Sequence, residues 1–344
     1  MDVSGYSRKN LVVTIWLSSM CIAILAMIFI GGLTRLTDSG LSITEWNPIS
    51  GIIPPLDYDN WNIEFEKYKQ SPEYIKHNIG MSLDKFKLIY LLEFIHRLAG
   101  RMTTLLYIIP LIIFIICRKI KHKEIPKYTF AMLLLLLQGA MGWYMVKSGL
   151  VSNPYVSHYR LALHLMLAVF LYIIIFWQLM RNSFDIMLLP SDVSLRPVSV
   201  LCEISIFLLL VQIMLGAFVA GLDAGLVYNS FPLMGDSFVP YELSVFNMSM
   251  VNFSDPVFVQ FMHRIVAYLL CFFLYLFFRE AMRIGNDKFF FAVFTVFFSL
   301  ILQLCLGVIT LIYNVPITFA LLHQIGAIVL LSCLLWSYFL IKFA

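Results

Sequence analysis

Eight long apolar segments dominate this sequence and limit what the chain can fold into. They cover roughly residues 11–30, 88–117, 128–146, 161–180, 204–220, 257–278, 289–313 and 317–341. Most are free of charge, and a helix needs about 20 such residues to cross a bilayer. Hydrophobic residues make up 61% of the 344 residues and charged residues 13%, a composition too apolar for a soluble or disordered chain. The sequence therefore predicts an all-α integral membrane protein with eight transmembrane helices.

Composition disfavours three other classes of protein. The net charge is only +4, and no block of Lys and Arg is interleaved with aromatic residues, so no nucleic-acid partner is expected. Short strands of alternating polarity are missing, which disfavours an outer-membrane barrel. The six cysteines lie within spans or at their inner ends and form no C-x-x-C, which disfavours outer disulfides and a thiolate metal site.

The loops alternate in charge along the chain. Lys and Arg gather at 8–9, 118–127, 181–196, 279–288 and 342, whereas residues 221–256 contain none. By the positive-inside rule, both termini are cytoplasmic, and the long loops 31–87 and 221–256 face outward. The first apolar run is too long for a signal-peptide core, and no Arg-rich, Ser-rich transit segment precedes it. We therefore expect a multi-pass membrane protein whose first helix is retained.

The two halves of the sequence resemble each other at three landmarks. The first half contains Glu93-Phe94-Ile95-His96-Arg97, Gln138-x-x-x-Gly142 and His164-x-x-x-Ala168; the second contains Gln260-Phe261-Met262-His263-Arg264, Gln303-x-x-x-Gly307 and His323-x-x-x-Ala327. Each half holds an even number of spans, so both enter the membrane in the same direction. This pattern predicts a parallel repeat, with residues 1–182 and 183–344 as its two units.

Four histidines fall inside predicted spans: His96, His164, His263 and His323. Each lies within about two turns of the outer end of its span, roughly 6–12 Å deep at about 1.5 Å per residue. Interhelical hydrogen bonds, proton relays and metal transport also use intramembrane histidines. Relays and transporters usually add carboxylates along the path, and no Asp or Glu lies away from the ends of the spans 128–146, 161–180, 257–278, 289–313 and 317–341. Pairs of imidazoles in an apolar pocket suit haem iron best.

Two further features accompany the histidines. Arg97 and Arg264 each follow a histidine and are expected to pair with haem propionates, although interfacial snorkelling would explain either one alone. Glu93 lies three residues before His96 on the same helix face, whereas Gln260 occupies the matching place before His263. Because an amide cannot exchange a proton, this difference predicts a catalytic first half and a cofactor-binding second half. The alternative is that Glu93 only pairs with Arg97.

Longer motifs show a resemblance to a known family over nearly the whole chain. They are Gly32-Leu33-Thr34-Arg35-Leu36-Thr37-Asp38-Ser39-Gly40-Leu41-Ser42, Glu45-Trp46, Gly51-Ile52-Ile53-Pro54-Pro55, the Glu93–Arg97 motif, Gln138-Gly139-Ala140-Met141-Gly142-Trp143-Tyr144-Met145-Val146-Lys147-Ser148-Gly149-Leu150, Ala220-Gly221-Leu222-Asp223-Ala224-Gly225, His263-Arg264 and His323-Gln324. With these motifs the sequence resembles the haem A synthases. Without cysteine pairs in its outer loops, it is similar to the proteobacterial and mitochondrial branch. Because no transit segment is seen, the resemblance implies the bacterial version and a bacterial inner membrane.

The resemblance implies eight helices in two four-helix bundles, and oxidation of the C8 methyl of haem O, through an alcohol, to the formyl group of haem A. It implies that His263 and His323 bind a haem b that moves electrons. It also implies that His96 and His164 hold the substrate haem beside Glu93. Haem O synthase and assembly factors of cytochrome oxidase are the expected partners, membrane lipid surrounds the chain, and assembly into a homo-oligomer stays open.

Two rival functions remain at this point. A di-haem b cytochrome that only transfers electrons would have interchangeable halves, and a haem or metal carrier would need a polar path across the membrane. Within the outer loop, Trp61, Phe65 and Tyr68 have helical spacing. A helix there would either lie over the substrate entrance or serve as an interfacial anchor.

Overall fold

A computed structural model describes residues 10–46, 51–150, 156–183, 194–244 and 252–343. Eight helices in it are long and apolar enough to cross a membrane, and the described residues contain no strand beyond one isolated bridge between Met234 and Ser237. The eight are α1 (Leu11–Leu36), α4 (Leu83–Ile116), α5 (Ile125–Gly149), α6 (His158–Ser183), α7 (Arg196–Gly221), α9 (Pro256–Ala281), α10 (Asp287–Ile312) and α11 (Ile317–Lys342). The prediction of an all-α fold with eight spans is confirmed.

Short helices complete the described chain. They are α2 (Tyr58–Lys69), α3 (Pro72–His77), α8 (Tyr241–Ser244) and the single 3-10 turns η1 (His122–Glu124), η2 (Ala224–Leu226) and η4 (Met282–Ile284).

The fourth helix begins earlier than its apolar run. The Ser82 side chain accepts a hydrogen bond from the Lys85 backbone N–H at 3.4 Å, so α4 starts at Leu83 rather than near residue 88. Hydropathy marks where a helix becomes apolar, whereas the cap sets where it begins. His96 therefore lies 13 residues past Leu83, and the expectation that every histidine is within two turns of a helix end is wrong for this one.

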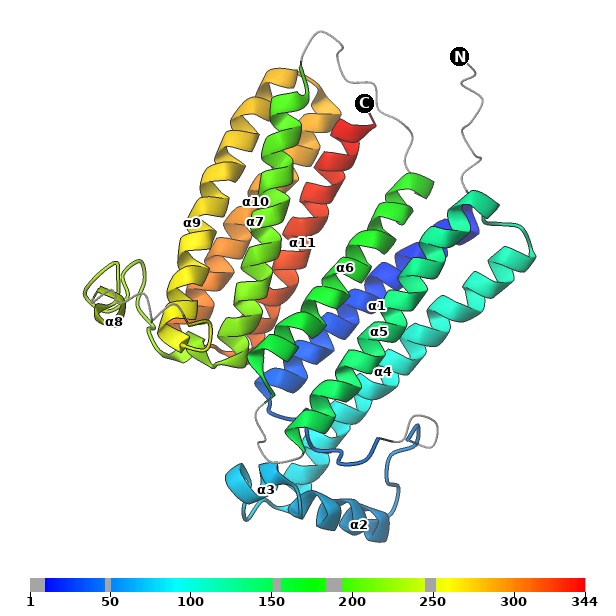
Figure 1. Cartoon of the computed structure of the whole chain (residues 1–344), viewed down its shortest axis with the longest axis vertical. Helices are drawn as coiled ribbons and strands as arrows, with labels where there is room; N and C mark the ends of the chain where they lie inside the picture. The colour runs from blue at the N-terminus through cyan, green and yellow to red at the C-terminus, as the bar shows by residue number, and fades with distance from the viewer. Residues whose placement is uncertain (1–9, 47–50, 151–155, 184–193, 245–251, 344) are drawn as a thin grey trace.

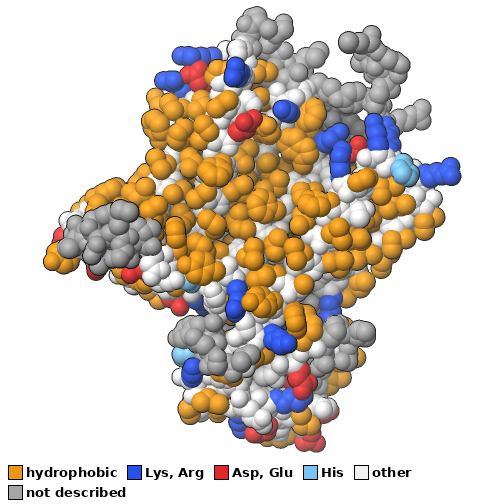
Figure 2. Space-filling model, viewed as in Figure 1, with side chains coloured by type: hydrophobic (Ala, Val, Ile, Leu, Met, Phe, Trp, Pro, Cys, Tyr) orange, Lys and Arg blue, Asp and Glu red, His pale blue; other side chains and the backbone are white. Residues whose placement is uncertain are grey.

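The long helices form two groups of four (Figure 1). The first group holds α1, α4, α5 and α6, and the second holds α7, α9, α10 and α11; α6 packs on α7 and α11, and α1 packs on α11. Gln324 in α11 donates to the Ile28 carbonyl of α1 at 3.1 Å. Figure 2 shows hydrophobic side chains over the middle of the visible face and charged ones mainly toward its ends, as a membrane protein requires.

The loops that follow α1 and α7 turn in the same way. Asp38 and Asp223 both adopt the left-handed conformation, with φ of 47° and 51°. Arg35 bonds both of them, Asp38 at 2.8 Å and Asp223 at 2.9 Å. Each of these two exposed ion pairs contributes about 1 kcal/mol or less, but together they join the matching turns that follow α1 and α7.

Helices α2 and α3 form a cap over the N-terminal end of α4, as Figure 1 shows. The Phe86 ring of α4 stacks on Phe65 and Tyr68 of α2, with ring centroids 4.9 and 5.1 Å apart. Trp61 meets Tyr90 edge to face at 5.2 Å. The helix predicted in this loop is thus present, and its aromatic face packs on α4 within the protein.

Candidate functional site

The structure brings the four predicted histidines together as two pairs, one in each helix group. His96 (α4) and His164 (α6) lie within electrostatic reach of each other, as do His263 (α9) and His323 (α11). All four side chains are half-buried. No cluster of three or more His, Cys, Asp and Glu that would hold a bare metal ion occurs among the described residues. The donor set of each group is therefore two imidazoles, which matches the two axial positions of a haem iron.

Each histidine faces a glycine of a neighbouring helix. The pairs are Gly31 with His96, Gly142 with His164, Gly216 with His263, and Gly307 with His323. A Cβ added to these glycines would lie 3.5, 3.3, 3.3 and 2.8 Å, in that order, from the nearest ring atom. In the sequence, Gly142 and Gly307 stand out only as landmarks of the repeat, and no pattern marks Gly31 or Gly216 as partners of the histidines. Because glycine has no side chain, each of these positions leaves space for the imidazole opposite it and for the plane of a haem beside that imidazole.

Ring nitrogens of three histidines are buried without a partner. The Nδ1 atoms of His164, His263 and His323 have no hydrogen bond, while Nε2 of His164 and of His263 lies 3.3 and 3.2 Å from the side-chain amide nitrogen of Gln138 and Gln212. Buried polar atoms are normally paired. The orphaned nitrogens, the glycines opposite the rings and the donor chemistry all fit a haem in each group.

Glu93 is the buried carboxylate of the first group, with an exposed fraction of 2%. Its Oε2 accepts from the Ser42 hydroxyl at 2.7 Å and from the Ile43 backbone N–H at 2.8 Å. Its Oε1 accepts from Arg97 Nε at 3.0 Å and Nη2 at 2.6 Å. Both oxygens of this carboxyl are therefore hydrogen-bonded, Oε2 by two neutral donors and Oε1 by two N–H groups of one guanidinium.

Both arginines hold the loops that follow the first helix of each group, α1 and α7. Arg97 donates to the carbonyls of Ile43 and Glu45 at 3.0 Å each, and its guanidinium carbon lies 5.0 Å from the centroid of the Trp46 ring. Arg264 donates to three carbonyls of the loop after α7: those of Tyr228, Ser230 and Leu233. The expectation that these arginines pair with propionates remains a prediction.

In both groups, the helix that carries the histidine and the arginine is hydrogen-bonded to a loop, and the two sets of bonds differ in the residue three positions before the histidine. Gln260 donates to the Tyr228 carbonyl at 2.9 Å, so it contacts the loop through an amide N–H. Glu93 contacts its loop as an acceptor and has an ion-pair partner. The repeat thus places a carboxylate in the first group where the second has a neutral amide.

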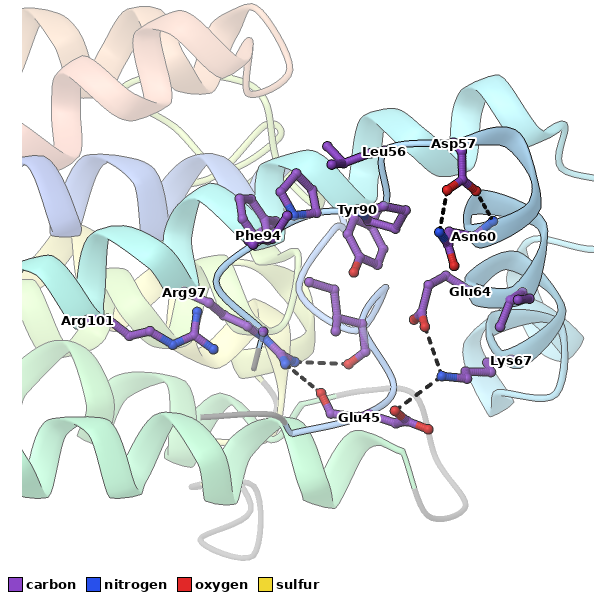
Figure 3. A pocket seen from close by; sticks show the side chains of 16 residues that line it. Glu45, Leu56, Asp57, Asn60, Glu64, Lys67, Tyr90, Phe94, Arg97 and Arg101 are labelled. Atoms are coloured by element: carbon purple, nitrogen blue, oxygen red, sulfur yellow. Dashed lines mark hydrogen bonds and ion pairs between the residues drawn. The ribbon is translucent and has the colours of Figure 1, made fainter. Parts of the chain in front are cut away.

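A cavity of about 450 Å³ opens beside this network, between α4, α2 and the loop before α2. Figure 3 shows Arg97, Tyr90 and Phe94 of α4 on one side and Lys67 on the other. Lys67 bonds Glu64 at 2.8 Å and Glu45 at 3.2 Å. The mixed apolar and charged lining places this cavity at the boundary between the apolar helices and the outer cap.

A second buried carboxyl lies in the cap. Glu73 of α3 is 7% exposed, and its Oε2 has no hydrogen-bond partner. Burial, the nearby charges of Glu93 and Asp38, and the partly compensating hydrogen bond with Tyr68 set the pKa of this carboxyl, which is raised to about 8. The sequence does not predict this residue, because nothing in a polar loop marks which acidic side chain will be buried by the fold.

The raised pKa of Glu73 predicts a cap that loosens as pH rises. An unfolded chain releases this proton near pH 4.5, whereas the folded cap keeps it to about pH 8. Stability is therefore full below about 4.5 and is lost progressively up to about 8. Hydrogen exchange of cap amides should speed up across this range beyond the intrinsic pH effect. In E73Q that extra dependence should vanish, and its persistence would show that another group is responsible.

Comparison with known proteins identifies the family. The family model described as "Cytochrome oxidase assembly protein" matches residues 14–335. The chain is 52% identical over 335 residues to "Heme A synthase" of Rickettsia bellii (strain OSU 85-389), covering 97% of this chain and 99% of that protein. It is 50% identical to "Heme A synthase" of Rickettsia felis and 49% identical to that of Rickettsia conorii, with the same coverage. The resemblance seen in the motifs is thereby confirmed, and the chain belongs to the cytochrome oxidase assembly protein family.

Proposed function

We propose that this protein is a haem A synthase, an oxidoreductase that converts haem O into haem A. Relatives at about half identity over nearly the full length carry that name. The observation that carries the proposal within the structure is the asymmetry of the repeat. A buried carboxylate, Glu93, stands beside the histidine pair of the first group, and Gln260 takes its place in the second.

The finer reaction is oxidation of the C8 methyl to a formyl group through an alcohol. In this proposal His96 and His164 hold the iron of haem O, and the methyl reacts in the first group. The catalytic residues are Glu93, His96 and His164. With water as the source of the oxygen atom, the methyl becomes the alcohol and the alcohol becomes the formyl group, and each of these two steps releases two protons and two electrons. The electrons pass to the second group, and Glu93 takes one of the protons at Oε1 or Oε2, or stabilises positive charge that develops at the reacting carbon.

The second group is proposed to hold haem b through His263 and His323. When bound, haem b would act as a one-electron carrier that accepts the electrons released in the first group. The orphaned Nδ1 atoms of both histidines, and Gly216 and Gly307 opposite their rings, support this assignment. Arg97 and Arg264 hold the loops of the two groups in place through hydrogen bonds to loop carbonyls.

A substitution at Gly307 tests the space beside His323. The Cβ of G307A would lie 2.8 Å from Cε1 of the imidazole, so the ring must shift and the iron loses a well-placed ligand. Purified G307A is expected to contain much less haem b than wild type. G139A is the control, because a Cβ at that glycine meets nothing within 4 Å. Equal haem content in G307A would mean that the ring has room to move.

The rival function is a di-haem b cytochrome that transfers electrons without chemistry. It predicts halves that are equivalent around their histidines. The ion pair between Glu93 and Arg97, absent at Gln260 and Arg264, favours the enzyme.

We place the protein as a multi-pass protein of a bacterial inner membrane with both termini cytoplasmic. The Lys and Arg bias between α4 and α5 supports this orientation. A reporter inserted within residues 119–126 should read cytoplasmic, and one within 58–76 should read external. The reverse result at both sites would put the histidines and the cap on the cytoplasmic side. Haem O synthase and oxidase assembly factors are the proposed partners.

Conversion of haem O in cells tests the function itself. The protein would be produced in a bacterium that makes haem O but no haem A, and the pigments would be extracted and identified by mass. Haem A, with some alcohol intermediate, is expected. Haem O alone, from a protein that is inserted and loaded with haem, would contradict the proposal.

A further inference from the structure

Gln324 follows His323 on α11, and the proposed function gives it no role. Its half-buried side chain reaches out of the second helix group, where Nε2 donates to the Ile28 carbonyl of α1 at 3.1 Å. In an α-helix this carbonyl points toward the residue four positions further along the chain. Because that residue is Gly32, no side chain covers the carbonyl, and a second donor can reach it. Gln324 therefore forms a directional bond between the helix that carries His323 and the first helix of the other group.

Two adjacent glycines of α1 contact different helix groups. A Cβ on Gly31 would lie 3.5 Å from Nε2 of His96. A Cβ on Gly32 would overlap the side-chain oxygen of Gln324 and would lie 3.0 Å from its Cδ. One turn of α1 therefore packs both against His96 and against the residue next to His323. The placement of α11 on this turn sets how the two histidine sites lie relative to each other.

The repeat contains a matching contact, between α6 and α7, that is made by different residues. Leu165 takes the place of Gln324 directly after the histidine of α6, and Ala217 takes the place of Gly32 directly after the glycine that faces His263. Leu165 packs on an apolar cluster that includes Ala217. Apolar side chains pack at several relative positions, whereas a hydrogen bond weakens steeply when its distance and angle depart from their optimum. The bond from Gln324 therefore fixes α11 on α1 more closely than an apolar pair would.

We propose that Gln324 is a positioning residue for electron transfer between the two helix groups, because its bond to α1 sets the place of His323 relative to the His96 site. The idea rests on the proposed function, which assigns haem b to the second group and a second haem to the first. Electron transfer between two haems slows steeply as the distance between their ring edges grows. A ligand-bearing helix must therefore be held in place by contacts beyond the ligand itself. Gln324 gains and loses no electron or proton.

Other hydrogen bonds also join the two groups, and one of them supplies a matched control. The Tyr172 hydroxyl of α6 lies 2.8 Å from the hydroxyl of Ser332, which is further along α11 and does not adjoin a histidine. S332A removes a bond between the groups from the same helix that carries Gln324. It should weaken the junction without moving the segment around His323.

Thermal unfolding of the purified full-length protein in lipid nanodiscs tests the contact itself. G32A should be destabilised, because the new Cβ overlaps the amide of Gln324. The double variant G32A/Q324L should recover, because it installs the alanine and leucine that the matching contact already uses. Such non-additivity is expected only of residues that touch. Additive effects of G32A and Q324L would overturn the proposal.

Flash-induced electron transfer tests the positioning role without turnover. Zinc protoporphyrin is bound to the first group of protein that retains haem b, and a light pulse makes it pass one electron to the ferric haem b, which becomes ferrous. The rate should fall several-fold in Q324L and in G32A/Q324L, while haem b content stays as in wild type. S332A should match wild type, and H96A, which weakens binding of the probe, should lose the signal.

Three results would overturn the proposal: no electron transfer in wild type, a wild-type rate in the folded G32A/Q324L, or an equal loss of rate in S332A. Haem A formation by wild type is measured separately. If wild type made no haem A, the proposed function would fail, whereas slower electron transfer in Q324L would still assign the positioning role to Gln324.

Discussion

Replacing Glu93 with glutamine is expected to lower haem A formation by the ~10²–10⁴-fold typical of a lost acid–base group. The substitution preserves the side-chain volume and one carbonyl acceptor for Ser42 and Ile43, but it removes the negative charge and the ability to take a proton. Haem should still bind through His96 and His164. Cells should accumulate haem O, measured by extraction and mass analysis.

Two control variants separate the chemical role of Glu93 from its structural one. Q260E makes the mirror change in the second group and should leave the products nearly unchanged. R97Q breaks the same ion pair but leaves the carboxylate in place. If the ion pair alone matters, R97Q and E93Q should be equally impaired. Normal haem A formation by E93Q would reduce the carboxylate to a partner of Arg97.

Replacing His263 or His323 with alanine is expected to remove haem b completely from the purified protein. Each variant would lose one of the two imidazoles proposed to hold haem b, and the nearest side chains, such as Gln212 beside His263, are poor donors to iron. The chain should still insert, because its apolar helices are untouched. The readout is the low-spin absorption spectrum per mole of protein.

The exposed His122 supplies the control for these variants. It lies in the 3-10 turn before α5, so H122A should retain the full spectrum. A full spectrum in both H263A and H323A would show that the second pair does not bind haem b.

The helices were predictable because a membrane span is set by its own composition. The histidine pairs were predictable because the repeat displays them twice, and the Glu93–Arg97 pair because i and i+4 share a helix face. The start of α4 was not, since the Ser82 cap lies outside the apolar run.

The contacts that define the site join segments that are far apart in the sequence, and a hydropathy profile does not show which of these segments meet. Glu93 reaches Ser42 and Ile43, about 50 residues earlier, because the turn after α1 folds back on α4. Glu73 is buried only because α2 and α3 close over it. Gly31 and Gly216 match as partners of His96 and His263, but only the packed helices show what each glycine faces.

The central claim is that the two helix groups hold different haems and that only the first one reacts. Its most direct test is extraction and mass identification of the haems in purified wild type, H96A and H323A. Wild type should yield haem b together with haem O or its oxidised products. H323A should lose haem b and keep haem O or its oxidised products. H96A should keep haem b and lose haem O and its products. Haem b alone in all three proteins would contradict the account and leave an electron-transfer cytochrome.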